Sequence, residues 1–283
     1  MQLQMIDNVE HNTAAELVSS IKAANDVRIA VAFVSSDGLL QIMPSVQTAL
    51  AAGAYVEFLV GMDVRATDPS AIKKLYDLTH ETSQVSLLCF ASRSASAIYH
   101  PKMYLMRDDH TATAIIGSSN LTRRGLTSNI EANVVIRDNV QAEIVSEIYS
   151  TYNRLKYHPD RVVPDDEFIA LFAELCQHEK LRERRLAKDS ELKKLKETFL
   201  GKANKLQRPK PTKADLVGWL ELVYSALPED RFTNREIYGY ENKFKQHYPQ
   251  NLNIRAKIRQ QLQILHKLGF IEHIGTGIWR KVR

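Results

Sequence analysis

Residues 99–132 read YHPKMYLMRDDHTATAIIGSSNLTRRGLTSNIEA, and the polar residues in this stretch decide how the whole chain is interpreted. His100 and Lys102 are two positions apart, so on a β-strand their side chains would lie on the same face. A G-S-S-N turn follows at Gly117–Asn120, and Glu131 lies in the apolar run that comes next. An imidazole and an ammonium on one face can contact the same phosphate, which indicates a catalytic arrangement and not only a basic patch.

Apolar runs on the amino-terminal side of this stretch predict alternating strands and helices. Runs typical of buried strands lie at Val27–Val34, Tyr55–Val60 and Gln84–Phe90. Helical patterns precede or separate them at Ala14–Ala24, Gly38–Ala52 and Pro69–Thr79. The alternation predicts an α/β fold in which helices cover a mixed sheet.

The stretch itself and its continuation supply the later strands of that sheet. Ile98–Met106 and Thr111–Ile116 flank the turn residues Asp108 and Asp109, which predicts a hairpin. The G-S-S-N turn then falls at the carboxyl end of a strand, where open α/β sheets usually bind ligands. A further strand is expected over residues 130–136 and a closing helix over residues 140–157.

Length and composition are those of a folded globular protein. The chain has 283 residues, 44% apolar and 25% charged, which accommodates two domains. No apolar run is long enough to span a membrane, and the first residues, MQLQMIDNVE, lack a signal-peptide pattern. We therefore expect a cytoplasmic protein with no membrane partner. Cys89 and Cys176 lack C-x-x-C spacing, which predicts buried free thiols and neither a disulfide framework nor a zinc site.

Charge is distributed unevenly along the chain. Residues 1–201 contain 22 Lys and Arg against 26 Asp and Glu, a net charge of −4. Residues 202–283 contain 16 Lys and Arg against 7 Asp and Glu, a net charge of +9. A compact segment with this positive charge attracts phosphate backbones, so nucleic acid is the first partner to expect.

We expect three parts along the chain. Residues 1–160 form the α/β domain, and residues 161–212 form a charged connector with a long helix over Asp165–Glu197 and a linker at its end. Opposite charges at helical spacing favour a solvated connector helix, and a functional basic patch is the alternative. Residues 213–283 form a second domain.

The second domain has the pattern of a winged helix-turn-helix. Helices are expected over Lys213–Ala226, Thr233–Gln246 and Asn253–Leu268, followed by a β-hairpin that turns at Gly275–Gly277. Away from its apolar stripe, the third helix carries side chains suited to base edges and phosphates. These candidate DNA-binding residues are Arg255, Lys257, Arg259, Gln260, Gln261 and Gln263. A winged helix that contacts proteins is the alternative, which the charge of +9 disfavours.

The chemistry of the central stretch fits a phosphodiester. Its cleavage needs a nucleophile, a clamp on the non-bridging oxygens and an acid for the leaving group. His100 can attack phosphorus, Lys102 can neutralise the oxygens, and Asn120 and backbone N–H groups around Ser118 can donate hydrogen bonds to them. Glu131 can accept the other ring N–H of the histidine and stabilise the imidazolium. This scheme requires no metal and no cofactor. A histidine satisfied beside a structural lysine is the alternative.

H-P-K, then G-S-S-N, then a later glutamate resembles the H-K-D motif of the phospholipase D superfamily, in the form seen in its metal-independent nucleases and restriction endonucleases. The resemblance covers about residues 15–160. It implies that one histidine attacks, that a second protonates the leaving oxygen, and that two motifs make one site. By position, the roles fall on His100, Lys102, Ser118, Asn120 and Glu131.

The chain departs from that motif at the aspartate. The pattern H-x-K-x4-D places Arg107 where the aspartate is expected, with Asp108 and Asp109 one and two positions late. Some restriction enzymes of the superfamily use the later glutamate instead. We therefore expect Asp108 to shape the hairpin turn and Glu131 to act near the histidine.

Only one copy of the motif is present. The other H-x-K, at His178–Lys180, is followed by no G-S-x-N and lies in a predicted helix, where positions i and i+2 point apart. A complete site therefore implies a two-fold homodimer with one His100 from each subunit.

The carboxyl-terminal segment resembles the winged helix of the Dam-replacing family of restriction endonucleases over about residues 215–282. The run NIRAKIRQQLQ followed by LGFIEHIGTG carries the resemblance. In that family the module reads a short DNA sequence, in some members only when it is methylated. Tyr238, Tyr240 and Trp279 are candidates to approach a methyl group, and core packing is the alternative for each.

The two resemblances together imply a homodimeric, metal-independent restriction endonuclease of type II-like organisation that acts on double-stranded DNA. A phospholipase D-type lipid phosphodiesterase is one alternative, since the fold alone permits it. A non-catalytic winged-helix DNA-binding regulator is the other.

Overall fold

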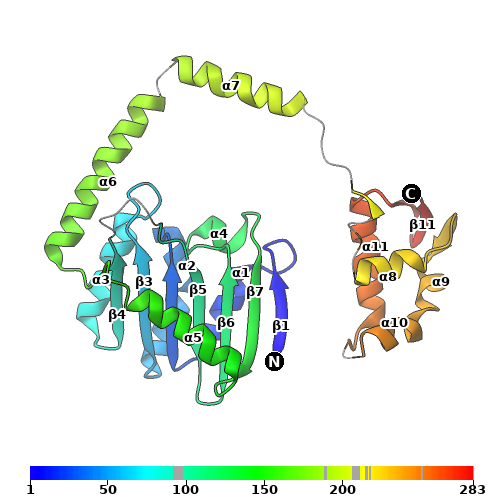
Figure 1. Ribbon diagram of the computed structural model, residues 1–283, viewed down its shortest axis with the longest axis horizontal. Helices are drawn as coiled ribbons and strands as arrows, with labels where there is room; N and C mark the ends of the chain where they lie inside the picture. Colours follow the sequence, from blue (N-terminus) through cyan, green and yellow to red (C-terminus); the bar gives the residue numbers. More distant parts are fainter. Residues whose placement is uncertain are drawn as a thin grey trace. The chain divides into compact units, whose positions relative to one another are not determined.

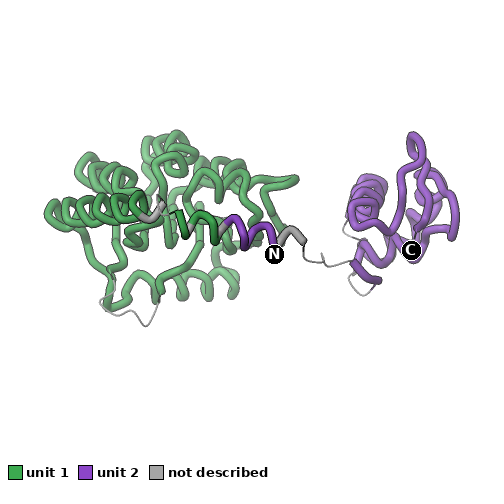
Figure 2. Tube along the Cα trace, turned by 90° about the horizontal axis from the view of Figure 1, so that it is seen from above, with its two compact units in different colours: residues 1–195 green, residues 196–283 purple. Residues whose placement is uncertain are grey.

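The computed structural model describes residues 1–91, 98–187, 190–205, 211–213, 216, 218–249 and 251–282. The chain forms two compact units, residues 1–195 and 196–283, and Figure 2 colours them separately. The division into three parts at residues 160 and 212, which the sequence led us to expect, stays a prediction. Each unit is described here by itself.

The first unit is built on an eight-stranded mixed sheet with the order β1-β7-β6-β5-β2-β3-β4-β8 (Figure 1). Strands β2, β3 and β4 are parallel, and β5 lies antiparallel to β2. Strands β6, β7 and β1 continue the sheet with antiparallel pairing. The bounds are β1 Gln2–Ile6, β2 Asp26–Val31, β3 Tyr55–Gly61, β4 Val85–Phe90, β5 Lys102–Arg107, β6 Thr111–Gly117, β7 Asn133–Asn139 and β8 Arg161–Val162.

These strand directions bring distant parts of the sequence to one edge of the sheet. The carboxyl ends of β2, β3, β4 and β6 lie at the same edge as the amino ends of β5 and β7, because β5 and β7 run opposite to the other four. We call this edge the site edge. Open α/β sheets usually bind ligands beyond the carboxyl ends of their parallel strands. In this sheet, the residues before β5 and β7 lie at that same edge.

Helices cover both faces of the sheet, as the alternating pattern predicts. Helices α1, α2, α3 and α6 and the short helix α4 pack on one face of the sheet, and α5 covers the other face (Figure 1). Strand β2 is buried almost throughout, which explains its continuous apolar run. The bounds are α1 Thr13–Lys22, α2 Ser36–Ala51, α3 Pro69–Glu81, α4 Arg123–Thr127, α5 Glu143–Lys156 and α6 Asp166–Ala187.

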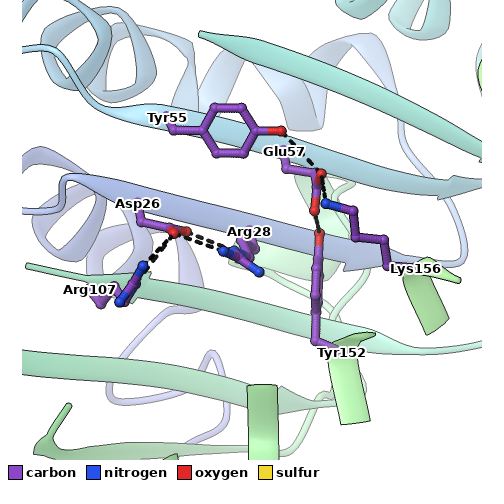
Figure 3. A network of polar contacts seen from close by, with 7 residues as sticks. All are labelled: Asp26, Arg28, Tyr55, Glu57, Arg107, Tyr152 and Lys156. Atoms are coloured by element: carbon purple, nitrogen blue, oxygen red, sulfur yellow. Dashed lines mark hydrogen bonds and ion pairs between the residues drawn. The ribbon is translucent and has the colours of Figure 1, made fainter. Parts of the chain in front are cut away.

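A buried polar network fastens α5 to its face of the sheet (Figure 3). Glu57 is 1% exposed, and it accepts hydrogen bonds from the hydroxyls of Tyr55 at 3.1 Å and Tyr152 at 3.0 Å. Lys156 Nζ lies 2.6 Å from the Glu57 carboxylate and completes the charge balance. Because every polar atom of this carboxylate has a partner, the network can be buried without leaving an uncompensated charge.

Several element boundaries differ from the sequence-based expectation. Strand β1 was not expected, and its side chains alternate between polar and apolar at an edge of the sheet. Strand β7 begins only at Asn133, so Glu131 lies in a loop and not on a strand. The expected helix over residues 165–197 is divided into α6 and α7 (Ser190–Lys205), and residues 188 and 189 between them lie outside the described residues.

The second unit has a winged helix-turn-helix arrangement of short helices and a three-stranded sheet of order β10-β11-β9. The capping box predicted at Thr233 and Glu236 is present. The expected helix over residues 233–246 is divided into two near Gly239, and part of the expected helix over residues 213–226 lies outside the described residues. The bounds are α8 Trp219–Ser225, β9 Arg231–Thr233, α9 Asn234–Tyr238, α10 Glu241–His247, α11 Ile254–Lys267, β10 Ile271–Gly275 and β11 Ile278–Lys281.

Candidate active site

The predicted catalytic residues of the first unit gather at the site edge. Lys102 begins β5 and pairs with Val31, the last residue of β2. Gly117 ends β6 and pairs with Asn133, the first residue of β7. Since β5 and β6 are neighbours, the H-x-K residues and the G-S-S-N turn emerge side by side.

His100 and Lys102 are in direct contact. Lys102 Nζ lies 2.6 Å from Nδ1 and 3.0 Å from Nε2 of the imidazole, and it donates a hydrogen bond to the His100 carbonyl at 2.9 Å. The imidazole is exposed, whereas Lys102 is only 6% exposed. Partial burial, together with the charge of Lys102, lowers the pKa of His100 below its usual value. This shift favours the neutral imidazole, the state in which a ring nitrogen can act as a nucleophile.

Lys102 has its own electrostatic balance. Burial lowers its pKa, and the Glu131 carboxylate opposes that shift by favouring the ammonium. The ring of Phe33 lies beside both Lys102 and His100. Its centroid is 5.9 Å from Lys102 Nζ. It is 5.4 Å from the centroid of the His100 ring, and the two rings meet edge to face. Phe33 follows β2 at the site edge and forms an apolar wall of the site.

Asn120 presents a hydrogen-bond donor to this site. Its Oδ1 accepts the backbone N–H of Phe33 at 3.1 Å, which fixes which way the amide faces. Its Nδ2 has no partner among the described residues. That these N–H groups donate to a phosphate oxygen stays a prediction from the sequence.

The sequence interpretation missed Asn133, which organises the G-S-S-N turn. This side chain is 1% exposed, and its Oδ1 accepts the backbone N–H groups of Ser118 and Ser119, both at 3.1 Å. Its Nδ2 donates to Ser119 Oγ at 2.9 Å and Thr13 Oγ1 at 3.2 Å. One amide therefore joins the end of β6, the start of β7 and the start of α1. No local pattern in the sequence marks this role, because it arises from contacts between segments that are far apart in the chain.

The turn also requires its glycine. A Cβ at Gly117 would lie 2.3 Å from the carbonyl oxygen of Ala132 and 2.5 Å from the Asn133 side chain. No side chain fits at that crossing of β6 with the residues before β7. The glycine of the motif is therefore a packing requirement of the turn.

Two roles expected from the sequence need correction. Glu131 was expected to accept a ring N–H of His100, but among the described residues its carboxylate is hydrogen bonded to Ser118 Oγ and to Asn129 Nδ2. Backbone N–H groups around Ser118 were expected to clamp phosphate, but Asn133 already accepts them. Both corrections have one cause, which is that residues 129–132 form a loop folded against the turn instead of a strand. Glu131 acts on Lys102 through its charge.

Asp108 has the turn role expected of it. Its carboxylate accepts the backbone N–H groups of His110 and Thr111, both at 2.7 Å, in the hairpin between β5 and β6. These hydrogen bonds, led by the one from Thr111, lower the pKa of Asp108 to about 2. The hairpin is at the opposite edge of the sheet from His100. His178 is exposed on α6, and its nearest charged partner is Glu174 at 3.9 Å.

In the second unit, the candidate DNA-binding residues of α11 do not all face outward. Gln261 is 4% exposed, because its position follows Ile254 by seven residues and Ile258 by three, which places it on the apolar stripe. The prediction of a DNA contact by Gln261 is therefore wrong for this conformation. Arg255, Arg259 and Gln263 are exposed, and Lys257 and Gln260 are partly exposed and hydrogen bonded to each other at 2.7 Å. Arg255 also pairs with Glu241 at 2.7 Å.

Two further properties concern the described part of the chain. None of its helices combines the length and apolar character needed to cross a bilayer. Within the same residues, His, Cys, Asp and Glu side chains form no group of three that could hold a metal ion. Cys89 and Cys176 are both buried free thiols, as predicted.

Replacing Asn133 with alanine should disrupt the G-S-S-N turn. The buried N–H of Ser119 loses its acceptor and the buried hydroxyls of Ser119 and Thr13 lose a donor, whereas the Ser118 N–H keeps the Ala132 carbonyl at 3.1 Å. Each buried unsatisfied group costs about 1–3 kcal/mol. We expect Asn133→Ala to lower the free energy of unfolding by about 2–4 kcal/mol in urea titrations. Asn139→Ala, the same change at the exposed end of β7, is the matched control and should cost less than about 1 kcal/mol. Equal losses in the two variants would show that Asn133 does not hold the turn.

The lowered pKa of His100 can be measured directly. In a ¹H–¹³C NMR titration, the His100 ring should titrate below the usual histidine value of about 6.5. Lys102→Met removes the nearby positive charge, so the pKa should move upward while burial keeps part of the depression. His110, exposed in the hairpin, serves as the internal reference in the same spectra. A His100 pKa that falls or stays constant in Lys102→Met would contradict the contact.

Comparison with known proteins agrees with this architecture. The family model described as "Cardiolipin synthase, PLD-like domain" matches residues 17–156, and the model described as "Dam-replacing HTH domain" matches residues 216–281.

Similar solved structures include NucT from Helicobacter pylori, with 15% identity over 54% of this chain and 94% of that chain and a TM-score of 0.42. Nuc from Salmonella typhimurium, a phospholipase D family member, has 23% identity over 53% of this chain and 90% of that chain, with a TM-score of 0.40. Phosphatidylserine synthase from Haemophilus influenzae has 13% identity over 66% of this chain and 47% of that chain, with a TM-score of 0.47.

The site edge with His100 and Lys102 lies inside the first matched segment, and helix α11 with its wing lies inside the second. The chain thus joins a domain of the phospholipase D-like family to a helix-turn-helix domain of the Dam-replacing family.

Proposed function

We propose that the protein is a site-specific DNA endonuclease that cleaves phosphodiesters through a phosphohistidine intermediate. The observation that carries this proposal is the contact between His100, whose pKa is lowered, and the buried Lys102, beside the free amide donor of Asn120. A neutral nucleophile, a cation and a neutral donor at one exposed edge are what attack on a phosphodiester anion requires. The attached helix-turn-helix domain and its charge of +9 over residues 202–283 favour DNA as the substrate.

In the proposed reaction, a ring nitrogen of His100 attacks phosphorus and the bond to the 3′-oxygen breaks. The leaving 3′-oxygen takes a proton from a second, protonated histidine, which becomes neutral. Water then attacks phosphorus, the phosphorus–nitrogen bond breaks to release His100, and the water gives a proton to that second histidine. The products are a free 3′-hydroxyl and a 5′-phosphate, and both histidines return to their starting states.

The supporting residues act on charge and position. Lys102 neutralises the non-bridging oxygens, and Asn120 Nδ2 donates to them as negative charge accumulates. Glu131 favours the ammonium form of Lys102, against the burial that would otherwise release its proton. Ser118 holds the Glu131 carboxylate in place and takes no direct part in the reaction. No step of this scheme uses a metal ion.

The second histidine would come from a second copy of the chain. The only other H-x-K sequence lies on α6, where His178 is exposed and lies 3.9 Å from Glu174. A two-fold axis through the scissile phosphate would bring two copies of His100 to opposite sides of it. A homodimer with one active site would then cut the two strands of DNA in succession.

Two other functions remain as outcomes of the tests. A phospholipase D-type lipid phosphodiesterase would use the same residues, but a lipid headgroup gives no role to the basic helix-turn-helix domain. A DNA-binding regulator without catalysis would need that domain but would not need the lowered pKa of His100. A restriction enzyme uses both features together.

Cleavage in the presence of EDTA tests the chemistry. We expect the protein to cut plasmid DNA without divalent metal, and His100→Ala to cut at least about 1000-fold more slowly, because it removes the nucleophile. His110→Ala, at the opposite edge of the sheet, is the matched control and should cut at the wild-type rate. Denaturing gels of acid-sensitive protein–DNA adducts should show the intermediate only when His100 is present. DNA binding without any cleavage would support the regulator instead.

Mixed dimers test whether one site needs two subunits. Tagged wild-type and untagged His100→Ala chains, co-expressed in equal amounts, should form wild-type, mixed and variant dimers in the proportions 1:2:1. If a site needs both histidines, activity falls to about one quarter of that of wild-type protein, whereas independent sites retain about one half. Activity near one half, in a preparation shown to contain mixed dimers, would contradict the shared site.

A further inference from the structure

An open groove of about 930 Å³ lies beside the candidate active site. Its lining is polar and includes Ser35 and Asp37 at the start of α2, Thr122, Arg123 and Arg124 at the start of α4, and Asn129 in the loop after it. A pocket for a small molecule is usually lined by apolar and aromatic side chains. This groove has none of the large apolar residues that such a pocket needs.

The groove is continuous with the catalytic residues through short chain segments and hydrogen bonds. Asn129 Nδ2 donates to Glu131 Oε1 at 3.2 Å, and the Thr122 backbone N–H donates to the Asn120 carbonyl at 2.8 Å. Ser35 follows Phe33 by two residues, and its N–H donates to the Leu121 carbonyl at 3.0 Å. The sugar–phosphate backbone of a nucleic-acid strand that lies at the site edge can therefore continue into the groove.

Two arginines of this groove are unpaired. Arg123 and Arg124 are exposed, and their guanidinium groups have no hydrogen bond or ion pair among the described residues. Other arginines of the same unit are engaged, as Arg28 and Arg107 are with Asp26. The only carboxylate in the lining is that of Asp37. The pair therefore presents uncompensated positive charge next to the site.

The backbone that carries these arginines is well held. Thr122 Oγ1 accepts the Gly125 N–H at 3.1 Å and caps α4, and the Arg124 carbonyl accepts the N–H groups of Ser128 at 2.9 Å and Asn129 at 2.7 Å. A Cβ at Gly125 would lie 2.8 Å from the Asn120 carbonyl, so α4 packs directly on the catalytic turn. The backbone positions of the two arginines are consequently fixed relative to Asn120.

We propose that this groove binds the DNA backbone next to the scissile phosphate, with Arg123 and Arg124 each pairing with a neighbouring phosphate. The proposal rests on the proposed nuclease function, because it assumes a DNA strand at the site edge. Guanidinium groups bind phosphate through two parallel N–H···O contacts, which fix position as well as charge. Such contacts set the register of the strand without reading its sequence. In a two-fold dimer, symmetry places one arginine pair on each side of the scissile phosphate.

Salt dependence of DNA binding tests the proposal. Binding of a short fluorescent duplex is measured with the full chain in the His100→Ala background, so that cleavage does not interfere. Loss of two phosphate contacts should reduce the slope of log K against log salt by about 1.8 in Arg123→Ala/Arg124→Ala. The ratio of the DNA association constants of the protein with both arginines and of the double alanine variant should then fall about tenfold between 50 and 200 mM salt.

Two variants control for charge and for structure. Lys22→Ala removes an exposed cation, which has no ion pair with any described residue, from the last turn of α1 at the opposite edge of the sheet, and it should leave the slope unchanged. Arg123→Lys/Arg124→Lys keeps both charges and should restore the slope, although affinity stays lower because lysine lacks the planar pair of donors. A slope unchanged in the double alanine variant, or reduced equally in Lys22→Ala, would overturn the proposal.

A second readout separates this proposal from the proposed function. The p-nitrophenyl ester of thymidine 5′-monophosphate has a single phosphodiester and no neighbouring phosphate. This test keeps the wild-type His100. The factor by which the double alanine variant lowers kcat/KM should be at least about fivefold larger for DNA than for this ester. Equal losses on both substrates would show that the arginines act on the reacting phosphate, against the proposal. If wild-type protein cleaves neither substrate, the nuclease function fails while the salt slope still decides the role of the arginines.

Discussion

The amide of Asn133 is the single constraint on which the candidate site depends most. Its four hydrogen bonds hold Ser118 and Ser119 against the start of β7 and reach Thr13 at the start of α1. The position of Asn120, one residue further along, follows from this turn and from the Phe33 N–H that orients its amide. Because Asn133 is buried and fully paired, the turn is rigid without any contribution from a ligand. The amide of Asn120 is therefore oriented by contacts within the protein alone.

Sheet topology explains why residues far apart in the sequence meet at this turn. If β5 had continued the parallel arrangement of β2, β3 and β4, its amino end would lie at the opposite edge of the sheet. The antiparallel pairing of β5 with β2 instead places Lys102 beside Val31. The same reversal moves Asp108 to the far edge, which is why it cannot substitute for a carboxylate near His100. Glu131, which enters from the start of β7, supplies negative charge at the correct edge.

Local patterns predicted most of the fold and part of the site. The apolar runs of β2, β3 and β4 and the spacing of His100 and Lys102 follow directly from strand periodicity. Phe33 and Asn133 could not be found in this way, because an apolar residue after a strand and an asparagine at the start of one are ordinary, and their roles arise from contacts across the sheet. Glu131 was assigned to a strand because Ile130 extended the apolar run, yet that isoleucine is fully exposed. Gln261 was assigned to the polar face of its helix by residue type, although its spacing from Ile258 belongs to the buried stripe.

Ion pairs elsewhere in the first unit compensate the charges of the buried carboxylates of Glu57 and Asp26. The Glu57 network and the contacts of Asp26 with Arg28 and Arg107 consume cationic side chains on the face covered by α5 (Figure 3). Residues 1–201 have a net charge of −4, so this part of the chain as a whole does not attract DNA. At the groove beside the site, Arg123 and Arg124 are nevertheless exposed without a partner among the described residues, and the strongly basic segment is residues 202–283. In the proposed function, long-range attraction would be supplied by residues 202–283, and the first unit would hold DNA at close range through Lys102, Asn120 and the two arginines of the groove. Such a division of charge would make cleavage depend on prior binding by the recognition domain, which is the property that site-specific cutting requires.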